Sequence, residues 1–182
     1  FDTAFSDLKK EIREEVQEKT FETFKDIQYK EGEYLGFKIK EDYIASLTDK
    51  DRHPALGSLS MGERLFLALS FISALKAATD YTFPLIIDTP LGRVSGLPRY
   101  LLSQALPKYL PNEQIIFLAT DTEFLVPITN WSDEKIEEAE KEGEKMLAAE
   151  GRPDESFGQM LERNINVKYY KIQREDGNTV IK

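Results

Sequence analysis

Two short elements of the sequence have the residue types and spacing to act on a phosphate group. The first is Leu59-Ser60-Met61-Gly62-Glu63, which stands directly before a long apolar stretch. A helix starting there would aim backbone amides and the positive end of its dipole at an anion, with Gly62 allowing close approach and Ser60 adding a hydroxyl. The second is Asp88, which follows three aliphatic residues. An aspartate at a strand end beside a phosphate suits Mg²⁺, which takes one or two carboxylates, water and phosphate oxygens.

Each element also has a simpler interpretation. Ser60 followed three residues later by Glu63 is the capping-box pattern, in which two side chains satisfy free amides at a helix N-terminus. Asp88 can cap the turn that follows it, where Pro90 and Gly92 fix a rigid loop. Spacing does not separate these alternatives, because the same local geometry serves both.

The sequence contains no lysine-bearing phosphate loop to accompany the two elements. None of its ten glycines is followed by lysine, so the GxxxxGK[ST] pattern is absent. We therefore expect the chain to act as part of a larger protein or of a two-chain assembly. Its first residue, Phe1 rather than a methionine, also suggests an upstream segment.

The composition excludes several classes of function. With 182 residues, 41% of them hydrophobic, the chain can form one domain with a packed core. A net charge of −9 argues against binding nucleic acid alone, because neutralising phosphates requires a basic surface. Zero cysteines and a single histidine exclude disulfides, thiolate sites and histidine clusters. No apolar run approaches the ~20 residues of a membrane span, and we expect a cytoplasmic protein.

The hydrophobic pattern before residue 80 predicts two helices and two strands. Residues 1–28 form a charged helix with one apolar seam, which is either a surface helix or the end of a coiled coil entering a globular head. Alternation over residues 35–47 predicts two short antiparallel strands. Residues 61–78 are apolar on nearly every side, so we expect a helix buried over most of its circumference. The seam consists of Phe1, Phe5, Leu8, Ile12 and Val16.

Two continuous apolar runs, residues 83–88 and 114–119, flank a predicted helix over 97–110. Apolar strands joined by a helix predict an α/β fold with a parallel sheet covered on both faces. Ligands bind such sheets at the carboxyl ends of the strands, where Asp88 and Asp121 are both placed.

The last third of the sequence has no such pattern. The composition of residues 133–150 predicts a charged, solvated helix or an insertion. A second short helix is predicted over residues 155–163. Glu175-Asp176-Gly177-Asn178 is a hairpin turn pattern, so residues 165–182 predict a β-hairpin.

Taken in order, these elements resemble the C-terminal half of an SMC-like ABC ATPase head, a group that includes coiled-coil DNA-repair and chromosome-organising ATPases. Within that group, residues 86–93 and 118–123 most resemble the DndD-type ATPases of DNA phosphorothioation defence systems. The resemblance is strong over residues 59–123, loose at both ends and absent over 133–150. It implies an α/β fold built on a P-loop NTPase-like sheet, in four parts: a coiled-coil end (1–30), the C-terminal lobe of the head (31–130), a charged helical insertion (131–164) and a hairpin (165–182).

The resemblance implies roles for the matched positions. Ser60 and Gly62, within the signature motif that includes Met61 and Glu63, would contact the γ-phosphate of ATP bound to the opposing head. Asp88 would be the Walker B acid that holds Mg²⁺ through water. The loop from Gly92 to Ser95, with Arg93, would cross between the heads.

Several positions depart from the common pattern of these ATPases. Thr89 stands where most carry the catalytic glutamate, Thr120 where they carry the switch histidine, and Ser95 where many carry aspartate. Threonine at the first two positions fits the DndD-like pattern, but Thr89 cannot act as a carboxylate base. Asp121 and Glu123 are the nearest carboxylates, and we hypothesise that Asp121 partly replaces the missing glutamate.

The resemblance further implies ATP and Mg²⁺ as cofactors and slow ATP hydrolysis coupled to DNA modification, defence or repair. Expected partners are the half of the head that bears the Walker A phosphate loop, on the same or a separate chain, and a second head in an ATP-dependent homodimer. DNA would be contacted through the whole assembly. Other subunits of the defence system would also be partners, and no contact with a membrane is expected. This chain alone would be inactive. Two alternatives stay open: a clamp or scaffold that binds ATP without hydrolysing it, and a small α/β interaction domain.

Overall fold

The structure of the chain is a computed structural model with an α/β arrangement. Its elements follow the order α1, β1, β2, α2, β3, α3, β4, α4, α7, β5, β6. The predicted charged helix over 133–150, together with Arg93 and Ser95, lies outside the described residues. The structure describes residues 2–28, 30–79, 84–89, 91–92, 94, 96–125, 156–170, 172–175 and 178–181.

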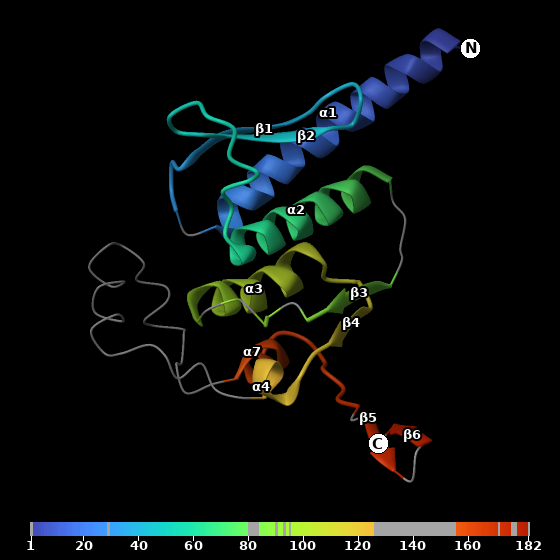
Figure 1. Ribbon diagram of the computed structural model, residues 1–182. Coiled ribbons are helices and arrows are strands. Elements are labelled where there is room, and N and C mark those ends of the chain that lie inside the picture. The colour runs from blue at the N-terminus through green and yellow to red at the C-terminus, as the bar shows by residue number, and fades with distance from the viewer. Residues whose placement is uncertain are drawn as a thin grey trace.

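The first helix, α1 (Asp2–Ile27), begins away from the other elements and ends among them (Figure 1). Its apolar seam is bare at the start, where 57% of Phe5 is exposed, and enters the core from Val16 onward. Phe24 is fully buried. The predicted helix is therefore confirmed, and its pairing in a coiled coil stays a prediction. None of the helices in the described part of the chain is long and apolar enough to cross a membrane.

A hairpin of two antiparallel strands, β1 (Tyr34–Ile39) and β2 (Ala45–Asp49), lies along α1 (Figure 1). Gly32, with a φ of 71°, makes the turn from α1 into β1, a conformation that glycine adopts at little cost. Phe37 stands opposite Leu47, and both side chains are buried. The two antiparallel strands predicted from the alternation are confirmed.

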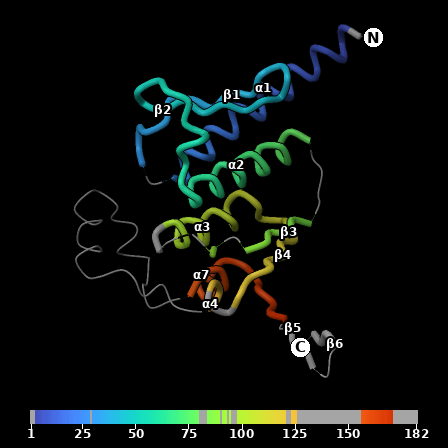
Figure 2. Tube along the Cα trace, viewed as in Figure 1, coloured from blue at the N-terminus to red at the C-terminus, as the bar shows by residue number. Residues whose placement is uncertain are grey.

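Helix α2 (Met61–Thr79) packs between α1 and α3 (Gly96–Tyr109), as Figure 2 shows along the chain trace. The side chains buried along α2 include Phe66, Leu67, Leu69, Ser70 and Ala74. Most of its circumference is covered, as the apolar sequence predicts, and Phe71 is among its exposed positions. This central helix therefore fixes the position of its own N-terminus, where the Ser60 element lies.

Strands β3 (Leu85–Asp88) and β4 (Ile115–Leu118) pair in parallel, as predicted. The prediction that this sheet is covered on both faces is wrong for the described chain. The side chains of one face pack against the core, whereas on the other face Ile86 is 61% exposed and Ile116 and Leu118 are also exposed. The reason is that the described elements cover only one face of a sheet of two strands.

Beyond β4 the chain continues into the short helix α4 (Asp121–Phe124), against which α7 (Phe157–Glu162) packs. Phe157 is fully buried and meets Phe117 and Phe124 edge to face, with ring centroids 6.0 and 5.2 Å apart. Helix α7 confirms the short helix predicted over 155–163. The predicted C-terminal hairpin is present as β5 (Ile172–Glu175) and β6 (Asn178–Ile181).

Two phenylalanines of α1 provide a matched test of where the core begins. Phe24→Ala should lower the free energy of unfolding by about 3–5 kcal/mol, because it leaves a cavity at a fully buried site. Phe5→Ala should change it by less than about 0.5 kcal/mol, because Phe5 is mostly exposed. Urea denaturation of both variants checks this, and equal losses would contradict the assignment of the core.

Candidate functional site

The sequence-predicted site residues gather at two places that a single turn connects. Ser60 and Gly62 lie at the start of α2, and Asp88 lies at the carboxyl end of the parallel sheet. After β3, Val94 lies near Gly62, and Gly92 lies near Glu123 of α4. The structure therefore brings the start of α2, the turn after β3 and α4 into one neighbourhood.

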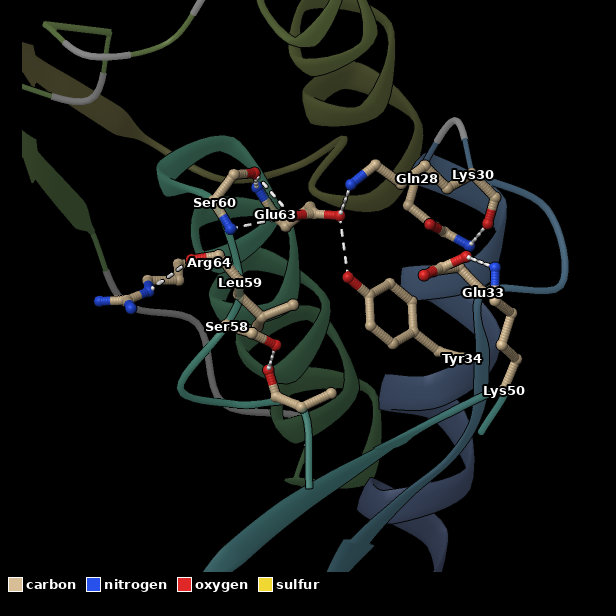
Figure 3. Close-up of polar contacts among 11 residues, drawn as sticks. Gln28, Lys30, Glu33, Tyr34, Lys50, Ser58, Leu59, Ser60, Glu63 and Arg64 are labelled. Carbon is tan, nitrogen blue, oxygen red and sulfur yellow. Dashed lines mark hydrogen bonds and ion pairs between the residues drawn. The ribbon is translucent and has the colours of Figure 1, made fainter. Parts of the chain in front are cut away.

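The start of α2 is closed by a capping box (Figure 3). The backbone N–H and the hydroxyl of Ser60 donate to Glu63 Oε2 at 2.8 and 2.7 Å. In return, the backbone N–H of Glu63 donates to Ser60 Oγ at 3.3 Å. The capping-box interpretation is therefore confirmed, while a phosphate contact by Ser60, which is exposed, stays a prediction.

Glu63 is a buried charge held by groups from three parts of the chain. Its side chain is 2% exposed, and Oε1 accepts hydrogen bonds from Lys30 Nζ at 2.9 Å and Tyr34 Oη at 2.8 Å (Figure 3). Burial by itself would raise the pKa of Glu63, but hydrogen bonds from Ser60, Lys30 and Tyr34 outweigh it and lower the pKa to about 2. Glu63 is therefore ionised throughout the physiological range.

Sequence reasoning missed Lys30 and Tyr34. They lie 33 and 29 positions before Glu63 in the chain, so no local spacing relates them to the capping box. Lys30 follows α1 within a charged segment, and Tyr34 begins a strand, so neither residue type stands out there. Only the packing of α1 against α2, and of β1 against α1, brings them to the carboxylate.

Gly62 has a packing role of its own. A Cβ atom at this position would lie 3.2 Å from Pro98 Cβ and 3.9 Å from Val94 Cγ1. Glycine therefore lets the first turn of α2 approach the first turn of α3. This packing explains the glycine without any ligand. The close approach of a phosphate to the backbone at Gly62 stays a prediction.

Asp88 points to the bare face of the sheet, together with Ile86. The next residue, Thr89, extends the sheet by donating its N–H to Leu118 O at 2.7 Å, although its φ is 44°. A β-branched residue rarely adopts a positive φ, and such strained backbone is concentrated at functional sites. The end of β3 is thus held in an unusual conformation directly beside Asp88.

Asp88 meets the requirement for Mg²⁺ only in part. Within the described ranges, no three carboxylate or histidine side chains come together to hold a metal. Mg²⁺ commonly uses one or two protein carboxylates and takes its other ligands from water and phosphate. An exposed carboxylate at a strand end fits that manner of binding, in which the nucleotide completes the site.

The turn after β3 is fixed by Arg99 of α3, which sequence reasoning also missed. Arg99 Nε donates to Val94 O at 2.9 Å and Nη2 donates to Leu91 O at 3.0 Å. A third, longer bond of 3.4 Å runs from Nη1 to Glu123 O. Burial lowers the pKa of Arg99, and the nearby Glu123 charge acts in the opposite direction. One guanidinium group therefore ties α3 to both the turn and α4.

Glu123 forms a second capping interaction, at the start of α4. Its Oε2 accepts the N–H of Thr120 at 2.9 Å and the Thr120 hydroxyl at 3.0 Å. The side chain is 6% exposed, and Oε1 has no hydrogen-bond partner among the described residues. Oε1 lies 3.0 Å from the place where a Cβ of residue 92 would be, so a larger residue there would require this carboxylate to shift. Asp121 begins α4, but its side chain lies outside the described atoms.

Comparisons with known proteins identify a fold but no family. No family model matches the sequence, and no curated protein matches it. A solved chain from work described as "Structural biochemistry of ATP-driven dimerization and DNA stimulated activation of SMC ATPases" is similar, with a TM-score of 0.51 and 10% sequence identity. The match covers 92% of this chain and 82% of that chain. This chain therefore shares the fold of an SMC ATPase, and a DndD-type assignment stays a prediction.

The lowered pKa of Glu63 predicts an acid-dependent loss of stability. A group whose pKa is lower when folded stabilises the fold above its unfolded pKa, and this contribution disappears as pH falls from about 4.5 towards 2. Glu63→Gln should therefore lose on the order of 3 kcal/mol at neutral pH, and the difference from wild type should shrink below pH 4.5. Urea denaturation between pH 3 and 7 measures this difference.

A control for that series is Glu33→Gln, which removes an exposed ion pair to Lys50 in the same region. It should change stability by less than about 1 kcal/mol. A difference between Glu63→Gln and wild type that stays constant from pH 7 to pH 3 would contradict the charged, hydrogen-bonded state of Glu63.

Arg99 allows a test of how the turn is held. Arg99→Met should lower the free energy of unfolding by about 2–3 kcal/mol, because partly buried carbonyl groups of the turn lose a charged donor. Arg99→Lys should recover little of this loss, since a single ammonium cannot reproduce the guanidinium fork. Urea denaturation measures both variants.

The control is Lys108→Met, which removes an exposed ion pair from the same helix and should leave the free energy of unfolding close to that of the wild type. A loss equal to that of Arg99→Met would contradict the role of the Arg99 guanidinium.

Proposed function

We propose that this chain is the C-terminal half of an SMC-like ATPase head that binds ATP between two heads and couples slow hydrolysis to DNA transactions. The observation that carries the proposal is the bare apolar face of the β3–β4 pair, beside Asp88. Parallel sheets are normally covered on both faces, and two strands are too few for an independently stable sheet. None of the described residues covers this face, so we propose that a further segment completes the sheet, and the phosphate loop missing from this sequence would be part of that segment.

In the completed head, each place described above would act on the nucleotide. Asp88 would hold Mg²⁺ through water at the carboxyl end of the sheet, where the metal ion, when bound, neutralises phosphate charge. Ser60, Met61, Gly62 and Glu63 would form the face presented to ATP on the opposing head. Ser60 and Met61 are exposed at the N-terminus of a long helix, which supports an anion contact there, while Gly62 and Glu63 are buried behind them.

The water that attacks the phosphate needs a group to orient it. Thr89 carries no carboxylate, and the Glu123 carboxylate already accepts two hydrogen bonds from Thr120 inside the protein. Asp121, the first residue of α4, is therefore our candidate for the general base. Without a glutamate after Asp88, turnover should be slow. Asp121→Asn would leave turnover unchanged if this assignment is wrong.

The partners we propose follow from the fold likeness and the charge. The similar solved chain is described as belonging to ATPases that dimerise with ATP and are stimulated by DNA, which supports a homodimer of heads here. A net charge of −9 favours contact with DNA through the assembly rather than through this chain. The runs 86–93 and 118–123 support a DndD-like role in phosphorothioation defence, with subunits of that system as partners, or else in repair.

A second candidate function is an ATP-dependent clamp or scaffold that does not hydrolyse its nucleotide. Thr89 favours it, because the usual position of the catalytic carboxylate holds a hydroxyl group. Both candidates require ATP to bring two heads together, and Arg93, which follows Gly92 in the sequence, would lie between them. They differ in phosphate release alone.

Phosphate release by this chain combined with its phosphate-loop half tests the proposal. Asp88→Asn should lower turnover on the order of 100-fold, because the metal ion loses its protein ligand. Asp7→Asn, which changes an exposed carboxylate on α1, is the matched control and should leave turnover intact.

The possible outcomes separate the candidates. Turnover that requires Asp88 supports the ATPase. No turnover, but dimers that form only with ATP in sedimentation, supports the clamp. Neither turnover nor ATP-dependent association would reject both and leave the α/β interaction domain.

A further inference from the structure

The two oxygens of the Glu63 carboxylate face different parts of the molecule. Oε1 accepts from Lys30 at 2.9 Å and Tyr34 at 2.8 Å, while Oε2 accepts from the backbone and hydroxyl of Ser60 at 2.8 and 2.7 Å (Figure 3). A carboxylate is planar, so the donors that fix Oε1 also fix the direction of Oε2. Glu63 is thus a rigid connection between the start of β1 and the Ser60 hydroxyl.

Lys30 and Tyr34 are themselves attached to the end of α1. The Tyr34 ring lies against Phe24, with centroids 5.4 Å apart. Gln28, which follows α1, donates through Nε2 to the carbonyl oxygen of Lys30 at 2.6 Å. A shift of the end of α1 would therefore move both donors of Oε1 together.

The Ser60 hydroxyl has one proton to donate, and here it is directed at Glu63 Oε2. A phosphate oxygen at this turn would compete with the carboxylate for that proton. The position of Glu63 therefore determines where the Ser60 hydroxyl points, and how readily it turns to another acceptor.

We infer that Lys30 and Tyr34 are positioning residues for Ser60, acting through Glu63, so that the end of α1 sets the geometry of the turn offered to ATP. The effect on ATP rests on the proposed function, whereas the effect on Ser60 does not. Neither residue touches the nucleotide in this scheme. They hold a buried carboxylate whose charge must be compensated, and the carboxylate holds Ser60.

The test uses two variants that keep side-chain bulk and one control from the same region. Lys30→Met removes the ammonium but keeps a stem of similar length, and Tyr34→Phe removes the hydroxyl but keeps the ring on Phe24. Lys30→Arg retains a charged donor and serves as the rescue variant. Lys50→Met is the control, since Lys50 pairs with Glu33 in the same region, and its described ion pair does not involve Glu63.

Two measurements are made on each variant combined with the phosphate-loop half. The first is hydrogen exchange of the Ser60 and Glu63 amides, which the capping box protects. The second is the dissociation constant of the ATP-dependent dimer by sedimentation. Lys30→Met and Tyr34→Phe should speed exchange and weaken the dimer by on the order of tenfold each. Lys30→Arg should largely restore both values, and exchange within α3 should not change.

Each outcome decides a different claim. If the wild type dimerises with ATP and both variants match it in exchange and affinity, the inference is wrong and the proposed function stands. If the wild type does not dimerise with ATP, the proposed function fails, and amide exchange alone decides whether Lys30 and Tyr34 position Ser60. Faster exchange in Lys50→Met equal to that of Lys30→Met, or faster exchange throughout α3, would also overturn the inference, because the effect would then be general loosening.

Discussion

The structure around the candidate site depends on keeping one buried charge satisfied. A carboxylate with 2% exposure is unfavourable unless donors surround it, and Glu63 receives them from the turn after α1, from β1 and from the turn before α2. Meeting that need fixes the segment from the end of α1 to β1 against the start of α2, which lies 29 to 33 positions later in the sequence. It also engages the Ser60 hydroxyl, so the group that we propose as a phosphate contact already donates a hydrogen bond to Glu63.

A second set of contacts orders the other side of the site in a similar way. Arg99 satisfies the carbonyl groups of Leu91 and Val94, and Glu123 satisfies the free donors at the start of α4. Val94 also lies near Gly62, so the turn after β3 is packed against the first turn of α2. Thr89, with its positive φ, stands before this turn and is bonded to Leu118 through its backbone N–H. Strained backbone of this kind is concentrated at functional sites.

The sheet, by contrast, is left incomplete. Its inner face joins the core through Leu85, Ile87 and Phe117, while its outer face presents Ile86 and Leu118 beside Asp88. An apolar surface next to an acidic strand end fits our proposal that a further segment adds here. The likeness to an SMC ATPase chain covers 92% of this chain, so the fold is shared along nearly its whole length.

The sequence by itself determined several local features: the seam of α1, the apolar α2 and the capping box at Ser60 and Glu63, which it offered as one of two interpretations. These follow from periodicity and from spacings of three or four residues, which act within one element. The parallel pairing of two aliphatic strands followed from the apolar runs and the helix between them. Tertiary structure alone decided that Lys30 and Tyr34 share Glu63, that Arg99 binds the carbonyl groups of the turn, and that one face of the sheet is left bare by the described residues. Those features depend on which elements meet in space, since a buried charge or carbonyl takes its partner from whatever packs beside it, at any distance along the chain.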